Sequence, residues 1–250
     1  MPVRVAPTAL LPLILLLLLT GFGTSAAALP ESFAAEFIVT SNGSTIGRTT
    51  WTLDAVGEGR FRFRSVTRAT GFMSLLFSGK RTEQSLWTYH EDRVRPLEYR
   101  YVRTGRKARD VKVSFDWAAS QAINRHDDDS WKLDITAGTQ DKLVYLLALM
   151  QDLAHGARDL VYPIADGGYL KEYAIERQGR ERLTTPVGTF DTVRLYRQDP
   201  KGKRHTTLWA AAELDYLPVK VRQEEQDGDV LAMTLEGLEG LGGTTDEGSD

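Results

Sequence analysis

Residues 184–238 decide the fold, and they read TTPVGTFDTVRLYRQDPKGKRHTTLWAAAELDYLPVKVRQEEQDGDVLAMTLEGL. Short alternations of apolar and polar residues are separated by turn residues at Pro186 and Gly188, and by the turns 199–202, 213–216 and 227–229. Alternation with a period of two predicts strands that bury one face, and short connections predict antiparallel neighbours. No catalytic motif lies in this stretch, so it indicates an architecture and not a reaction.

The same alternation continues toward the N-terminus. Its clearest example is residues 60–64, Arg-Phe-Arg-Phe-Arg, which place Phe61 and Phe63 on one face and three arginines on the other. One dry and one wet face are typical of antiparallel sheets. We expect further strands at 33–39, 45–53, 83–90, 97–103, 109–117, 121–125, 131–136, 169–176 and 180–185, the last two forming a hairpin around Gln178 and Gly179.

One segment has a helical period. Apolar residues recur at i, i+3, i+4, i+7 and i+10 within residues 140–154, namely at Leu143, Leu146, Leu147, Met150 and Leu153. Thr139 is the expected N-cap, and Gly156 is the expected residue that ends the helix. We therefore predict an all-β dominated domain at 29–239: an antiparallel meander of about a dozen strands, curved into an open or nearly closed barrel, with this amphipathic helix packed on its concave side.

Both ends of the chain differ from this domain. Residues 1–28 combine Arg4, an apolar run at 9–19 and small residues at 25–28, which is the pattern of a cleavable signal peptide. The apolar run is too short to span a bilayer, and no later run approaches spanning length. The chain has no Cys for a lipoprotein anchor. We expect export to the periplasm without a transmembrane segment, and an acidic disordered tail at 240–250.

Sequence motifs for catalysis or metal binding are missing. There is no Gly-x-Ser-x-Gly elbow, no Ser-x-x-Lys motif and no thiol nucleophile. The four histidines are scattered, and the cluster His126-Asp127-Asp128-Asp129 lacks the alternating ligands and central glycine of a calcium loop, which favours a solvated turn. We expect no catalytic residues, no cofactor and no metal, and an exported acidic chain without a basic-aromatic motif is not expected to bind nucleic acid.

Two surfaces are candidate sites. The segment 71–79 is unusually apolar for a loop, and it is either buried core or the lip of an apolar cavity that contacts a ligand, a membrane or a partner. With the helix it gives these candidate ligand-binding residues: Phe72, Met73, Leu75, Leu76, Phe77, Leu143, Leu147 and Met150. Residues 60–112 hold 14 Lys and Arg against 5 Asp and Glu, so Arg60, Arg62 and Arg64 are candidates for contact with an anionic surface, or else an ordinary charged outer face.

A resemblance to a known family rests on motifs in order along the chain. They are Thr185-Pro186-Val187-Gly188-Thr189-Phe190, Thr207-Leu208-Trp209, Leu217-Pro218-Val219-Lys220 and Asp227-Gly228, with Arg95-Pro96-Leu97-Glu98-Tyr99, Phe115-Asp116-Trp117 and Gln140-Asp141 before them. In these motifs the chain resembles an exported bacterial family classified as domain of unknown function 3108. The resemblance implies an envelope protein of antiparallel β architecture and assigns no catalytic residues.

Three functions are compatible with this reading. The first is a non-catalytic envelope protein that binds an apolar or amphipathic ligand, such as a lipid, between sheet and helix. The second is an interaction or assembly factor that binds another envelope protein through the basic face or a sheet edge. The third is a hydrolase of envelope polymers, which needs two convergent carboxylates that the sequence does not display.

Overall fold

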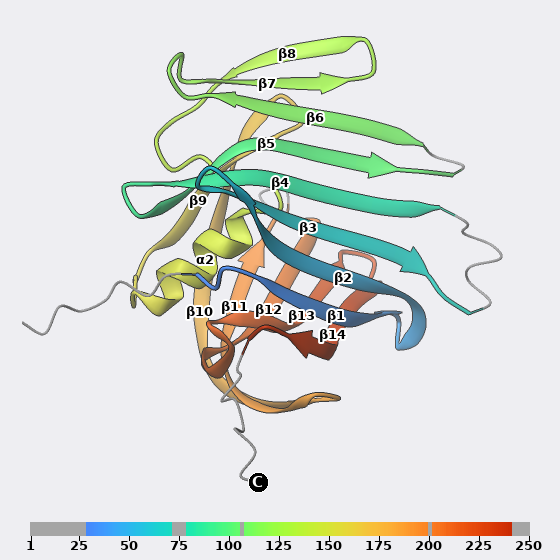
Figure 1. Ribbon diagram of the computed structural model, residues 1–250. Helices are drawn as coiled ribbons and strands as arrows, with labels where there is room; N and C mark the ends of the chain where they lie inside the picture. Colours follow the sequence, from blue (N-terminus) through green and yellow to red (C-terminus); the bar gives the residue numbers. More distant parts are fainter. Residues whose placement is uncertain (1–28, 72–78, 106–107, 200–201, 242–250) are drawn as a thin grey trace, which may run out of the picture.

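A computed structural model describes residues 29–71, 79–105, 108–199 and 202–241. The predicted signal peptide and residues 242–250 of the tail predicted at 240–250 lie outside these residues. The described chain forms one fourteen-stranded antiparallel sheet with the order β8-β7-β6-β5-β4-β3-β2-β1-β14-β13-β12-β11-β10-β9. Strands that are neighbours in sequence therefore pair, except β8 and β9, which are the two edges. The pairing of β1 with β14 joins the two halves of the meander. The sheet curves until it is nearly closed, which confirms the predicted barrel (Figure 1).

The strand boundaries follow the turn residues of the sequence. The first seven strands are β1 (Phe33–Ser41), β2 (Ser44–Gly57), β3 (Arg60–Ala69), β4 (Lys80–His90), β5 (Arg93–Arg103), β6 (Arg109–Asp116) and β7 (Gln121–His126). The other seven are β8 (Asp129–Asp134), β9 (Leu160–Asp166), β10 (Tyr169–Thr185), β11 (Gly188–Gln198), β12 (Arg204–Ala211), β13 (Leu217–Glu225) and β14 (Val230–Glu239). The short 3₁₀ helix η1 (Ala212–Leu214) connects β12 to β13.

Alternation places one face of each strand inside the barrel. Trp51 and Leu53 of β2 and Phe63 of β3 are buried there, as their spacing predicts. Arg48 and Arg62 stand at the intervening positions and carry exposed side chains. The buried apolar side chains form a continuous core that gathers residues from all parts of the sheet and from the helix. This core supplies the main stabilisation of the fold.

The segment before the helix links the edge strand β9 to the other half of the sheet. The backbone of Gln140 forms a parallel bridge with β9, because its N–H donates to Pro163 O at 2.8 Å and its carbonyl accepts from Ala165 N at 2.9 Å. Its side chain reaches the other half of the barrel, where Nε2 donates to Val94 O in β5 at 2.9 Å. Gln140 thus bridges edge strand β9 to β5 across the gap in the sheet.

The helix α2 (Tyr145–Ala154) lies inside the curved sheet, against β5 and β9 (Figure 1). It begins later than the predicted range 140–154 because Gln140 pairs with β9 and residues 142–144 form a turn. Thr139 is not the N-cap, since its hydroxyl bonds to the backbone of Thr136. Val144 is the N-cap of α2, and its side chain makes no capping hydrogen bond. Asp141 instead caps the turn before the helix, because it accepts the N–H groups of residues 143 and 144, each at 2.8 Å. Gly156 follows the helix with φ +70°, as expected for its end.

Two sequence predictions in the region 157–185 are wrong. The expected hairpin around Gln178 and Gly179 is one continuous strand, β10, in which the register against β11 shifts between Arg177 and Gly179. A β-bulge therefore accommodates the glycine that the sequence presented as a turn. The hairpin partner of β10 is β9, at residues for which no strand was predicted. Its Pro163 is tolerated because β9 is an edge strand that needs no donor at that position.

We predict that Leu147→Ala lowers the free energy of unfolding by about 3 kcal/mol, because Leu147 is 0% exposed in the packed helix and sheet interface and its truncation leaves a cavity. Urea unfolding at neutral pH measures the change. Leu170→Ala is the control, since Leu170 is 39% exposed and its truncation should cost less than about 1 kcal/mol. Equal losses in the two variants would contradict the central position of α2 in the core.

Candidate ligand-binding cavity

The interior of the barrel is divided into a packed half and a hollow half. On the inner face of β1 to β4, large aromatic side chains fill the half beside α2, namely Phe37, Trp51, Phe63 and Trp87. Toward the other end of the same strands the inner positions hold small side chains: Ser41, Gly47, Thr49, Thr67 and Ala69. These small residues cannot fill the barrel, and a cavity of about 1130 Å³ remains there.

Gly47 holds two strands of the cavity wall together. A Cβ at this position would lie 2.4 Å from the backbone oxygen of Arg68 on the neighbouring strand β3. Any larger residue would therefore push β3 away from β2 at the point where both strands line the cavity. Because Gly47 has no side chain, β2 and β3 can approach closely, and the cavity is larger at this point.

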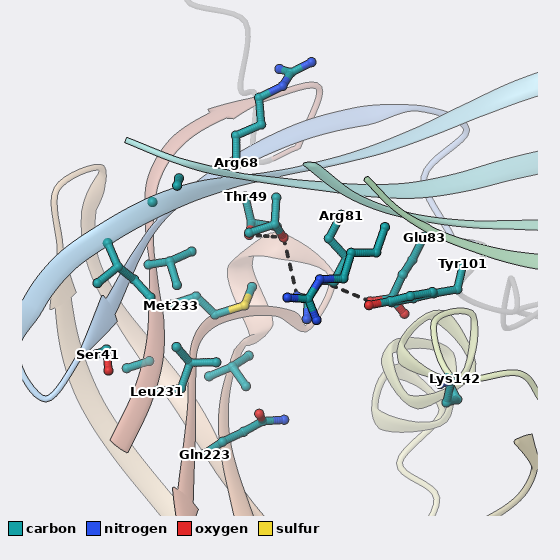
Figure 2. Close-up of a pocket in the computed structure, with 18 of the residues that line it drawn as sticks. Ser41, Thr49, Arg68, Arg81, Glu83, Tyr101, Lys142, Gln223, Leu231 and Met233 are labelled. Atoms are coloured by element: carbon teal, nitrogen blue, oxygen red, sulfur yellow. Dashed lines mark hydrogen bonds and ion pairs between the residues drawn. The ribbon is translucent and has the colours of Figure 1, made fainter. Parts of the chain in front are cut away.

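One side of the cavity is apolar. Val39 of β1, Val221 of β13, and Leu231 and Met233 of β14 are inner-face residues of adjacent strands, and all four line the cavity. Val39 and Val221 are both paired with Met233 in the sheet register, so these side chains form a contiguous surface. Figure 2 shows Leu231 and Met233 on the side of the cavity opposite Arg81.

The opposite side is polar and rich in cations. Arg81 of β4 points into the cavity in Figure 2, where its side chain lies 3.4 Å from Thr67 Oγ1 and 3.6 Å from Glu83 Oε1. Lys142, from the turn before α2, contacts Asp166 at 3.0 Å and faces the rings of Tyr99 and Tyr101. The cavity therefore has an amphipathic wall, with an apolar β13-β14-β1 side and a cationic side formed by β4 and the Lys142 turn.

A third group of lining residues forms a corner between the helix and β10 to β12. Tyr145 of α2 and Tyr173 of β10 make an edge-on ring contact at 5.3 Å, and the guanidinium of Arg197 lies 3.8 Å from the centre of the Tyr173 ring. All three residues line the cavity. Aromatic faces hold a cation in place while leaving its N–H groups available.

Buried polar groups connect the cationic side to the base of the helix. Tyr99 donates its hydroxyl to Glu83 at 2.8 Å, and Ser85 donates to Asp141 Oδ1 at 2.8 Å. Burial and the neighbouring Glu83 raise the pKa of the Tyr99 phenol. Asp141 is fully buried, and desolvation raises the pKa of its carboxyl to about 6, although the bonds from Val144, Leu143 and Ser85 oppose the shift. Among the described residues its second oxygen, Oδ2, has no hydrogen-bond partner.

The structure places the predicted site residues in different regions. Leu143, Leu147 and Met150 are buried in the packed half, and none of them lines the cavity. The interface between sheet and helix is thus filled, and the hollow lies beyond it. The residues Phe72, Met73, Leu75, Leu76 and Phe77 lie outside the described residues. Ala69 and Gly79, which flank that segment, line the cavity.

The predicted basic face lies on the outside of the barrel. Arg60, Arg62 and Arg64 alternate with inward residues of β3, as their spacing predicts. Arg60 forms an ion pair with Glu58, and Arg62 lies 3.3 Å from Asp54. Contact of this face with an anionic surface stays a prediction. In the part of the chain that the structure describes, no three His, Cys, Asp or Glu side chains gather in a metal-binding arrangement.

Sequence reasoning missed the polar residues of the cavity. A signal for Arg197 is present, because it continues the inward series of β11 after Leu195, so a charged residue falls where an apolar one is expected. Glu83 before Ser85 and Trp87 in β4 gives a similar signal. Lys142 gives none, since its approach to the cavity depends on the turn between Gln140 and α2.

Comparison with known sequences and folds agrees with this geometry. The profile of a family described as "Protein of unknown function (DUF3108)" matches residues 36–236. The chain belongs to this family. The match includes all the strands that line the cavity, so the DUF3108 domain and the barrel are the same unit. Among curated protein sequences, none matches the chain significantly.

Two solved structures are similar to this DUF3108 protein to different degrees. A β-barrel-like protein of a different domain of unknown function, DUF1849, from Brucella abortus is 12% identical, with a TM-score of 0.56 over 85% of this chain and 98% of that one. A candidate lipoprotein from Parabacteroides distasonis is also 12% identical, with a TM-score of 0.37 over 85% of this chain and 97% of that one. The Brucella structure confirms a barrel-like fold.

We predict that Asp141 makes stability depend on pH. Because its pKa is about 6 in the folded protein and 3.8 in the unfolded chain, the folded state binds the proton more tightly. The associated stability is fully present below pH 3.8 and is lost as the pH rises to about 6. The free energy of unfolding of the wild type, relative to Asp141→Asn, should fall by on the order of 2 to 3 kcal/mol between pH 4 and 7.5 in urea titrations.

Asp110 provides a control of opposite sign. Its carboxylate is paired with Arg100 on the barrel surface, and this pairing lowers its pKa. Stability linked to Asp110 is therefore present at neutral pH and is lost as the pH falls below its usual pKa. The free energy of unfolding of the wild type, relative to that of Asp110→Asn, should rise as the pH rises. If the corresponding difference between the wild type and Asp141→Asn does not change with pH, the raised pKa of Asp141 is contradicted.

Proposed function

We propose that this protein is a non-catalytic protein of the cell envelope that binds an amphipathic small molecule in the hollow half of its barrel. The observation that carries the proposal is the cavity of about 1130 Å³, which has an apolar side and a cationic side. This volume is slightly above the usual range for ligand pockets, and it suits a molecule with a long apolar chain better than a small metabolite.

The two sides of the wall suit two parts of one ligand. An apolar chain placed against Val39, Val221, Leu231 and Met233 would remove apolar surface from water on both molecules. Polar atoms of the ligand would face the cationic side, where hydrogen-bond donors already line the space. The proposed position differs from the predicted one between sheet and helix, because Leu143, Leu147 and Met150 are buried and do not line the cavity.

Location in the periplasm is part of the proposal. It is supported by the pattern of residues 1–28, which is typical of a cleavable signal peptide. The described residues contain no helix with the length and apolar character needed to cross a bilayer. A carrier or receptor for an amphiphile would be exposed there to the lipids and lipid-like molecules of the envelope.

A binding function fits the cavity better than hydrolysis does. Glu83 is the carboxylate among the described lining residues, and its oxygens face the Tyr99 hydroxyl and the Arg81 guanidinium. Hydrolysis of an envelope polymer by general acid and base catalysis would call for a second carboxylate that also faces the cavity. Asp141 lies near Glu83, but it is fully buried and does not line the cavity. The arrangement of Glu83 instead resembles a structural group that orients Arg81.

A second candidate function, binding of another envelope protein, is favoured by the sheet edges. Exposed apolar side chains occur on β8 and on the β9-β10 hairpin: Trp131, Val161, Tyr169 and Leu170. Trp131 lies beside Gly168 of that hairpin, so the group spans both edges. Photo-crosslinking from position 169 in cells should capture one defined protein partner, whereas position 187 on the β10-β11 turn should not.

We predict that the purified protein binds the neutral fluorescent probe N-phenyl-1-naphthylamine and that the double variant Val221→Trp with Met233→Trp weakens binding at least about tenfold. The two residues are paired neighbours on the apolar side, so two indole rings there would occupy the space of the ligand chain. Fluorescence titration gives the dissociation constants.

The matched control is Arg222→Trp with Thr234→Trp, which places two indoles on the same strands but on the outer face. This variant should bind the probe about as well as the wild type. Failure of the wild type to bind the probe, or equal binding by the two tryptophan variants, would overturn the proposed cavity function. Mass spectrometry of organic extracts of the protein would then identify natural ligands.

A further inference from the structure

We propose that the cavity recognises amphiphiles with an oxyanion head group, a carboxylate or a phosphate ester, and that Arg197 binds this group. The inference rests on the proposed function and names the ligand class for the same cavity. It starts from one anomaly of the barrel interior. Arg197 is a buried arginine whose charge is not matched by any acid among the described residues.

Arg197 projects inward from β11 at the border of the packed and hollow halves. Its residue exposure is 9%, and the preceding inward residue, Leu195, is completely buried. The guanidinium lies on the ring of Tyr173, and one terminal nitrogen is 3.3 Å from Thr206 Oγ1. Its Nε has no hydrogen-bond partner in the described structure. The side chain is thus held in position by its neighbours while part of its donor set is unused.

Other cations of the cavity wall differ from Arg197 in their partners or their exposure. Lys142 is neutralised by Asp166 at 3.0 Å, and Arg204 by Glu225 at 2.5 Å. Arg81 lies 3.6 Å from Glu83. Arg103 is exposed at the end of β5, where water solvates it. Arg197 therefore combines burial with the lack of a carboxylate partner within the described cavity.

Burial of an unpaired charge is costly, and proteins normally pair such a charge or expose it. A binding site can hold an unpaired buried charge because the ligand supplies the missing partner when it binds. The planar guanidinium offers two parallel N–H groups, which match the oxygens of a carboxylate or a phosphate. Tyr145 and Tyr173 also line this corner, and a tyrosine hydroxyl that faces the head group would be a further donor.

The position of Arg197 fixes how the ligand would lie. The corner of Arg197, Tyr145 and Tyr173 adjoins the packed half, so the head group would sit at the inner end of the cavity. The chain would then extend along Val221 and Met233 toward the open end. Exposed Arg103 at that end would attract anions electrostatically without holding them.

The test compares ligands that differ only in the head group. Dodecanoate, dodecyl phosphate and dodecanol each displace N-phenyl-1-naphthylamine from the wild-type protein in a competition titration. The two anions should bind at least about tenfold more tightly than the alcohol, because only they neutralise Arg197. Acetate and inorganic phosphate, which lack the chain, should displace the probe only at concentrations higher by a factor of about a hundred or more.

Variants then assign the effect to one residue. Arg197→Met keeps an unbranched side chain on the Tyr173 ring but removes the charge, and it should abolish the preference for the anions while leaving dodecanol binding unchanged. Arg204→Met is the control, because Arg204 lines the cavity but is already paired with Glu225. Its preference for the anions should change less than about threefold.

Thermal unfolding separates recognition from a structural role. Ligand-free Arg197→Met should melt at or above the wild-type temperature, since an unpaired buried charge is removed, and dodecanoate should raise its melting temperature less than that of the wild type. A lower melting temperature with an intact preference for anions would show a purely structural Arg197. Arg197→Lys, which keeps the charge but loses the planar fork, should retain folding and lose part of the preference.

The outcomes distinguish the two proposals. Binding of probe and dodecanol without a preference for the anions would overturn the oxyanion site and leave the cavity function standing. Absence of all binding would overturn the cavity function itself. Acetate or phosphate binding as tightly as dodecanoate would show a site for free anions and overturn the amphiphile class. A preference that survives in both Arg197 variants would place the oxyanion elsewhere.

Discussion

The bridge made by Gln140 is the constraint on which the rest of the barrel depends. A sheet of fourteen strands has two edges, β8 and β9, and an unpaired edge exposes backbone groups that need partners. Gln140 gives β9 a backbone partner and at the same time bonds to β5 through its side chain. The meander is thereby held in a nearly closed form, and the chain is led into the barrel where α2 begins.

Placement of the helix inside the barrel then divides the interior. The apolar stripe of α2 is satisfied by the large aromatic residues of the neighbouring strands, which together make a tightly packed half. The helix has ten residues, whereas β4 and β5 have eleven each. Because a helix rises much less per residue than a strand, α2 is too short to fill the whole length of the barrel. The remaining half is left to small inner side chains such as Thr49 and Ala69, and it stays hollow.

The chemistry of the hollow half is set by its position between packed core and solvent. Apolar residues of β13, β14 and β1 continue the core along one side, whereas β4 and the turn at Lys142 present cations on the other. Buried charges such as Asp141 and Arg197 lie at the border between the two halves, where each is held by hydrogen bonds yet retains an unsatisfied polar atom. Unsatisfied buried polar atoms destabilise a folded protein, and such local departures from good packing are expected mainly at functional sites.

The sequence was enough to predict the antiparallel meander, the inward and outward faces of strands such as β3, and the existence of an amphipathic helix, because period-two and period-3.6 patterns are local signals. It did not determine β9 or the continuity of β10, since a proline at an edge and a glycine in a bulge look like breaks until pairing partners are known. Only the tertiary structure decided that Leu143, Leu147 and Met150 belong to the core and that Arg81, Lys142 and Arg197 face one cavity. Convergence of residues from distant strands depends on register and closure, which no local pattern encodes.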